Sequence, residues 1–136
     1  MDAILTAIIS RTAGSTLNTL VGGRLYAEEA PARTAYPYVV FHATGRPEYT
    51  FTEIYEIYTV QFTMYSSSSG LTEITGIYDA VKSLFDDASL TVTGYRAVWC
   101  RREDTAMLPP IKITTPSGTE MVRCWTVDYE IKISLN

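Results

Sequence analysis

His42 is the single histidine of this chain and the first residue to consider as a catalytic base. A base of this kind needs a nucleophile or an orienting carboxylate beside it in space. The neighbours of His42 on the same face of its predicted strand, Tyr38 and Val40, supply neither. We therefore expect His42 to have a structural or surface role.

The two cysteines, Cys100 and Cys124, stand singly, without a CxxC pair. Structural zinc sites usually show close pairs of ligands in the sequence. In a reducing compartment such thiols behave as small, buried, apolar groups. A disulfide stays open as an alternative, if the strands that carry the two residues lie side by side with suitable geometry.

Three acidic pairs and two segments of small residues are the remaining candidates for a catalytic or phosphate-binding site. Glu28-Glu29, Asp86-Asp87 and Glu103-Asp104 are adjacent in sequence and fall at predicted loops or element ends, which is typical of solvated charge. Residues 22–23 and 66–70 lack the lysine and spacing of a phosphate-binding loop. We expect no catalytic, cofactor or metal site and no enzymatic activity.

Composition indicates one domain spanning residues 1–136. The chain is 46% apolar and 19% charged, and its apolar runs are far shorter than the ~20 residues that cross a bilayer. Its start carries Asp2 where a secretion signal has positive charge, so we expect synthesis and assembly in the cytoplasm. The net charge of −4 and scattered Lys and Arg argue against sequence-specific nucleic-acid binding. A weakly acidic surface would instead suit a channel through which DNA slides.

The hydrophobic pattern predicts helices separated by strands. Residues 2–12 and 71–85 have apolar side chains at spacings of three and four, and a short stretch between them ends at Gly22-Gly23. The segments 56–64 and 125–135 alternate apolar and polar residues, as half-buried antiparallel strands do. Further strands are predicted at 38–43, 90–102, 111–115 and 119–123. The fold class is α+β, a mostly antiparallel sheet with helices packed on one face.

Two segments outside the core pattern are candidate interaction sites. The stretch 46–56, read as a connection after a turn at 45–47, carries aromatic residues among Thr and Glu. The stretch 101–104, also read as a loop, is fully charged. The candidate interface residues are Arg46, Glu48, Tyr49, Phe51, Arg101, Arg102, Glu103 and Asp104.

The order and the residue patterns of several segments resemble those of the tail-completion, or tail-terminator, family of long-tailed bacteriophages. The segments are Gly23-Arg24-Leu25-Tyr26, Ala30-Pro31, Tyr36-Pro37-Tyr38-Val39-Val40-Phe41, Tyr58 to Tyr65 with the Ser-rich break after it, the Ile74-to-Phe85 helix and Trp125 to Ile131. The resemblance spans about Ile4 to Leu135, although the stretch from Pro109 to Gly118 is longer than the family pattern leads one to expect.

This resemblance implies a structural virion subunit at the head–tail junction. Such a subunit forms a hexameric ring that caps the head-proximal end of the tail tube, ends tube polymerisation and presents a joining surface to the head. The implied partners are further copies of the chain, the tail tube protein and a head-side connector, with DNA passing through the lumen and no membrane. Two alternatives stay open: a head-side neck or stopper protein, and a small ligand-binding or enzymatic α+β domain.

Overall fold

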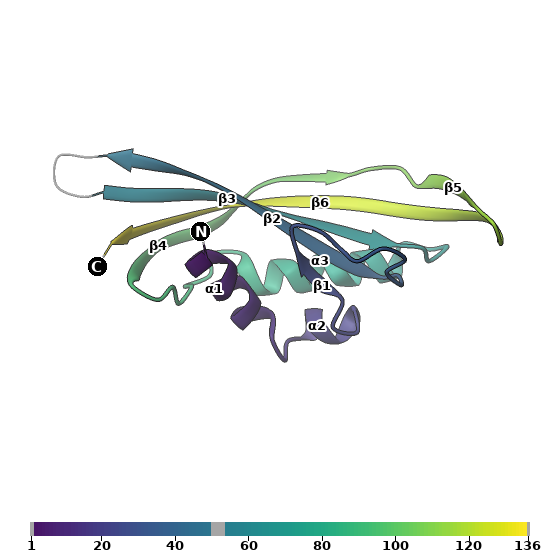
Figure 1. Ribbon diagram of the computed structural model, residues 1–136, viewed down its shortest axis with the longest axis horizontal. Coiled ribbons are helices and arrows are strands. Elements are labelled where there is room, and N and C mark those ends of the chain that lie inside the picture. Colours follow the sequence, from purple (N-terminus) through teal and green to yellow (C-terminus); the bar gives the residue numbers. More distant parts are fainter. Residues whose placement is uncertain (1, 50–53, 136) are drawn as a thin grey trace.

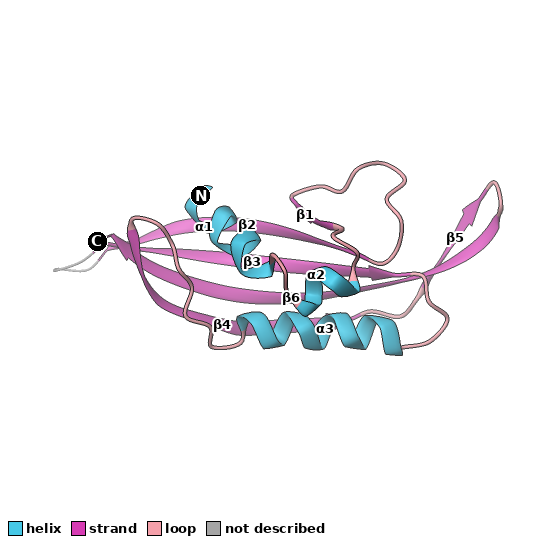
Figure 2. Cartoon of the chain, turned by 90° about the horizontal axis from the view of Figure 1, so that it is seen from below, coloured by secondary structure: helices cyan, strands magenta, loops and turns pink. Residues whose placement is uncertain are grey.

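The computed structural model describes residues 2–49 and 54–135. All helices in this part of the chain cover one face of a twisted sheet, which leaves the opposite, outer face without a covering layer (Figures 1 and 2). The predicted α+β class is therefore confirmed. The elements in chain order are α1 (Asp2–Thr12), α2 (Thr16–Leu20), β1 (Leu25–Ala27), β2 (Tyr38–Tyr49), β3 (Ile54–Ser66), α3 (Thr72–Phe85), β4 (Tyr95–Met107), β5 (Ile111–Thr115) and β6 (Gly118–Leu135).

The strands form a mixed sheet in the order β1-β2-β3-β6-β4, with β5 paired to the far end of β6. Among the strands of the described residues, β1 alone runs parallel to its neighbour β2, and the other pairings are antiparallel. The alternation predicted for β3 and β6 is confirmed, since Phe62 and Val127 are buried whereas Gln61 and Asp128 lie on the outer face. β1 lies within a segment that the sequence indicated only as a surface connection.

The core lies between the sheet and α3. The apolar stripe of α3 buries Ile74, Ile77 and Phe85 completely. The ring of Phe62 in β3 lies 4.8 Å from the ring of Phe85 and 6.0 Å from that of Tyr129, measured between centroids. Packing of this kind, more than helix propensity, holds an amphipathic helix on a sheet. The predicted 71–85 helix is confirmed, although it begins at Thr72 without a side-chain cap from the Ser-rich break.

The N-terminal helices add to the same core. Ile4, Ile8 and Leu17 have no exposed surface. Ser15 caps the N-terminal end of α2, and its hydroxyl accepts a hydrogen bond of 3.2 Å from the amide of Asn18, which satisfies one of the free donors at a helix start. Ile9, one of the apolar residues of the predicted 2–12 helix, lies outside this core and is 51% exposed.

The prediction of a turn at 45–47 is wrong, because β2 continues to Tyr49 and β3 begins at Ile54. Gly45 is needed here for close packing and not for a turn. A Cβ at this position would lie 2.5 Å from the ring of Tyr58, which faces Gly45 across the strand pair. The glycine therefore makes space for a buried aromatic ring within a continuous strand.

The loop reading of the charged stretch 101–104 is also wrong. Arg101 and Arg102 lie in a strand, as the predicted 90–102 strand has them, and Glu103 and Asp104 continue it inside β4, which starts at Tyr95, later than expected. It forms one edge of the sheet, and its pairing with β6 shifts register twice, leaving Val98 and Glu103 as extra residues. Bulges and charge at an edge strand discourage unwanted strand addition.

Candidate interaction surfaces

His42 lies on the exposed outer side of β2, where its Nδ1 is 2.5 Å from a carboxylate oxygen of Glu28. The pairing of β1 with β2 brings the two together, and the amide of Glu28 also donates to the carbonyl of Phe41 over 2.8 Å. Sequence reasoning missed this carboxylate because it lies fourteen positions away. The pair ties the loop after β1 to the sheet.

Cys100 and Cys124 are both free thiols. β4 and β6 are neighbours, but Cys100 lies opposite Ile131, whereas Cys124 lies opposite Tyr65 near the other end of the sheet. The disulfide alternative is therefore excluded by register. Burial raises the pKa of the Cys100 thiol to about 12, so this group is a poor nucleophile. No cluster of three or more His, Cys, Asp or Glu side chains suited to a metal occurs among the residues that the structure describes.

The outer face of the sheet carries a ladder of cations and aromatic rings, formed by Arg101, Trp99, Lys132 and Tyr55. The guanidinium of Arg101 lies 4.1 Å from the ring centre of Trp99, and the amine of Lys132 lies 4.7 Å from that ring and 4.2 Å from that of Tyr55. Glu130 anchors the ladder, accepting bonds from the Trp99 indole (3.0 Å) and from Arg101 (2.8 Å). Aromatic residues and Arg are the types enriched in protein interfaces.

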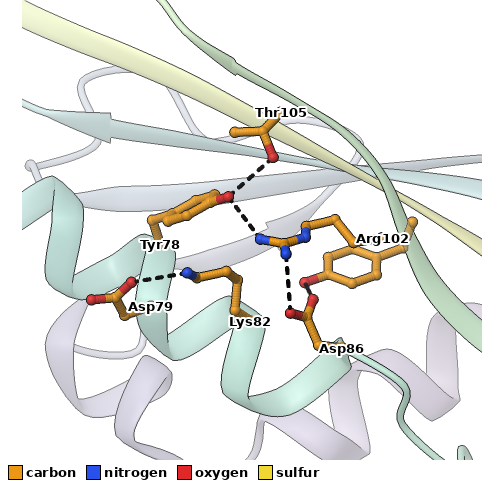
Figure 3. A network of polar contacts seen from close by, with 7 residues as sticks. Tyr78, Asp79, Lys82, Asp86, Arg102 and Thr105 are labelled. Carbon is orange, nitrogen blue, oxygen red and sulfur yellow. Dashed lines mark hydrogen bonds and ion pairs between the residues drawn. The ribbon is translucent and has the colours of Figure 1, made fainter.

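Arg102, the next residue, points to the opposite side and joins a polar network between β4 and α3 (Figure 3). Its guanidinium donates to the hydroxyl of Tyr78 over 3.0 Å and lies 3.6 Å from the carboxylate of Asp86. The hydroxyl of Tyr78 also bonds to Thr105 over 3.1 Å. Arg101 and Arg102, which are adjacent in the sequence, thus lie on different faces of the sheet.

The structure does not bring the other predicted interface residues into one site. Arg46 is exposed on β2, and the backbones of Glu48 and Tyr49 extend that strand opposite Tyr55 and Ile54. Phe51 lies outside the described residues. At the other edge of the sheet, Glu103 lies 3.6 Å from Arg101, and the carboxylate of Asp104 accepts from the amide of Thr105.

The strands predicted at 111–115 and 119–123, with a hairpin tip at 116–118, do pair as a hairpin. Sequence reasoning did not show that this hairpin projects as an arm, defined here as residues 111–122. The pairing of β3 with β6 ends at Arg123, so the arm has two strands only, and it extends beyond the helices (Figure 2). Ile111, Ile113 and Met121 are 55%, 39% and 39% exposed, and Met107 and Leu108 add exposed apolar surface at its base. The signal was present in the sequence, because the strand after Pro109-Pro110 has apolar residues with no helix predicted to cover them.

A second surface missed in the sequence is the α2–α3 groove, which has a volume of about 310 Å³. Leu17, Ala80 and Leu84 give it an apolar lining, and Thr16, Gly76, Asp79 and Ser83 complete it. Only the folded structure places α2 beside α3, so no local pattern could have shown this groove.

None of the helices formed by the described residues has the length and hydrophobicity that a bilayer crossing requires. Together, these features define an α+β subunit with an uncovered sheet face, an apolar arm and an apolar groove.

Comparison with known proteins identifies the class of this subunit. Residues 3–109 match the family described as "Tail completion protein gp17", so the chain belongs to that family, a family of structural proteins of phage tails. The family match ends at Pro109, just before the arm.

Two solved structures share the fold. One is a chain of the "Virion of native gene transfer agent (GTA) particle", with a TM-score of 0.72, 16% identity, and coverage of 95% of this chain and 92% of that chain. A second solved chain has a TM-score of 0.52, 14% identity, and coverage of 96% and 94%. No curated protein matches the sequence.

Proposed function

We propose that this protein caps the head-proximal end of a phage tail tube as a closed, hexameric ring. In this role the ring ends tube polymerisation and presents the surface that the head joins. Membership of the tail completion family is the observation that carries the proposal. The virion neighbour of the same fold supports it further.

The outer face of the sheet is suited to line the lumen of such a ring. Some of its charged groups have partners within the chain: Arg101 pairs with the carboxylate of Glu130, Arg96 donates to the hydroxyl of Ser134, and Asp128 accepts from Gln61. Because Glu130 neutralises Arg101, this cation offers little to phosphate groups, and the chain carries a net charge of −4. DNA would therefore slide through without adhering.

Contacts between subunits are expected to use side chains more than strand pairing. β4 is an edge strand, but its two bulges and its charged residues hinder a regular ladder with a neighbour. A ring of identical subunits closes when two different patches of each subunit meet head to tail. The partners in this proposal are further copies of the chain, the tail tube protein and a head-side connector.

Deletion of the gene from its phage, with negative-stain electron microscopy of the lysate, tests the proposal. We expect filled heads beside unattached tails of irregular or excessive length. The wild-type gene supplied in trans is the control and should restore joined particles. Free tails of normal length would support the alternative of a head-side neck protein. Intact infectious particles would contradict both functions and favour the ligand-binding alternative.

A further inference from the structure

The junction between the arm and the rest of the sheet, here called the body, is narrow. Trp125 is the last residue of β6 that has a partner on each side, one in β3 and one in β4. Within the described residues, Arg123 and Cys124 pair with β3 and not with β4 or β5, whereas Val122 and the residues of β6 before it pair with β5. The strand beside β6 therefore changes between Arg123 and Val122. Among the described strands, β6 alone continues through the junction.

The second connection between the body and the arm is a proline segment outside the strands. β4 ends at Met107 and β5 begins at Ile111, and two of the three residues in 108–110 are prolines. A proline has no amide hydrogen to donate to a neighbouring strand. The four residue steps from Met107 to Ile111 also face only three steps of β6, from Trp125 to Val122. β5 therefore does not continue the register of β4.

Packing holds the arm at its base and not along its length. Val122, next to the junction, is buried, whereas Ile111, Ile113 and Met121 are exposed on a ribbon that extends beyond the helices (Figure 2). The hydrophobic core formed by the described residues contains no residue of the arm. A two-stranded ribbon is at best marginally stable alone in water. Segments with few buried apolar contacts are those that open locally in a folded protein.

The ladder of β4 and β6 would close without the arm. Met107 lies opposite Trp125 at the end of this ladder, and opposite residues of antiparallel strands have Cα atoms about 4.5–5.5 Å apart. A short turn spans such a gap. The arm is thus an insertion at the end of a hairpin that the body already contains.

We propose that the arm is a hinged element that changes its angle to the sheet, bending where β6 crosses the junction and at residues 108–110, while the body keeps its fold. Bending at these two places separates no pair between β6 and its neighbours in the body, because the pairing with β4 ends at Trp125 and the pairing with β3 ends at Arg123. The inference does not depend on the proposed ring, since it concerns the motion of the free chain.

Distances between spin labels in the full-length free chain test the hinge. One pair of labels joins the arm to the body through Thr119→Cys and Thr75→Cys, and the matched control pair, Thr59→Cys and Thr75→Cys, lies within the body; all three positions are exposed. Both chains also carry Cys124→Ser, and the remaining native thiol, Cys100, is buried. Double electron–electron resonance should give an arm–body distance distribution about twice as wide as the control or wider, as expected of a hinge motion. Equally narrow distributions would overturn the inference.

A chain without the arm tests whether the body folds by itself. Replacement of residues 108–122 by Asn-Gly closes Met107 on Trp125 with a short loop and leaves the pairing of β6 with β3 intact. Hydrogen exchange measured by NMR should protect the amide of Tyr129 to within about tenfold of its value in the full-length chain. Phe62→Ala, which removes a fully buried side chain of the body, is the control and should lower this protection by about a hundredfold or more. An equal loss of protection in the chain without the arm would mean that the arm belongs to the folding unit, which would overturn the inference.

Discussion

The phenol of Tyr129, in the central strand β6, donates a hydrogen bond of 2.6 Å to the carboxylate of Asp86 at the end of α3. Tyr129 has no exposed surface, so this bond crosses the core and emerges at the helix end. Arg102 approaches the same carboxylate from β4, at 3.6 Å. Asp86 is therefore held from two strands, which fixes the end of α3 against the sheet.

Replacement of Tyr129 by Phe tests this bond through the dependence of stability on pH. Burial, reinforced by the bond to Asp86, raises the pKa of Tyr129 above its usual value of 10.0. The folded chain therefore keeps a proton that the unfolded chain loses above pH 10, so this contribution is complete below that pH and declines as pH rises.

The expected slope is up to about 1.4 kcal/mol per pH unit from this one phenol. Urea unfolding at pH 8 and above pH 10 should show a shallower decline for Tyr129→Phe than for the wild type. At pH 8 the variant should be less stable by about 1 kcal/mol, because one hydrogen bond is lost. Burial also raises the pKa of Tyr58, so part of the decline will remain. Identical slopes for the two proteins would contradict the prediction.

The adjacent arginines should differ in their importance for stability. Arg101→Ala removes an exposed ion pair with Glu130, and such pairs contribute about 0–1 kcal/mol. Arg102→Ala removes a bond that links β4 to Tyr78 and Asp86 on α3, and we expect a loss of about 1–2 kcal/mol. Thermal or urea unfolding of the two variants shows which of them loses more stability. An equal or larger loss for Arg101→Ala would mean that the outer ladder, and not the α3 network, is the stabilising unit.

For the substitution Gly45→Val, strand propensity and packing predict changes in folding stability of opposite sign. On propensity alone, Gly45→Val in a strand should stabilise by up to about 1 kcal/mol. A Cβ there would lie 2.5 Å from the ring of Tyr58, which is 6% exposed, so we expect destabilisation by about 1–3 kcal/mol. Thr44→Val, at the preceding exposed position, is the control and should change stability little. Chemical unfolding compares them, and a more stable Gly45→Val chain would show that the ring moves freely.

The same glycine explains why the predicted boundary of β2 was wrong. Glycine followed by arginine and proline is a frequent turn signal, and only the partner across the strand pair shows its purpose. The helices and the long strands were predictable because each shows its period within a few residues, as Tyr58 to Met64 do. The charges of 101–104 gave no such period, since the bulge at Glu103 interrupts the alternation of β4.

The surroundings of the candidate interface residues could be predicted less fully than the fold, for a physical reason. These residues were chosen because they are charged or aromatic, and their role in an interface stays a prediction. The sequence did not show that Arg102 and Arg101 bond to partners within the chain. The groove around Gly76 forms where α2 packs beside α3, and no local sequence pattern predicts such a tertiary contact. The carboxylate partner of His42 was missed for the same reason.

The two thiols should differ in reactivity, which checks the register of β4 on β6. Cys100 is 1% exposed, and burial raises its pKa to about 12, whereas Cys124 is only partly buried. Because the thiolate is the reacting form, iodoacetamide at pH 8 should modify Cys124 well before Cys100, as followed by peptide mass spectrometry. In urea the two should react at similar rates, which controls for local sequence. Faster modification of Cys100 in the folded chain would mean that β4 does not cover this part of the core.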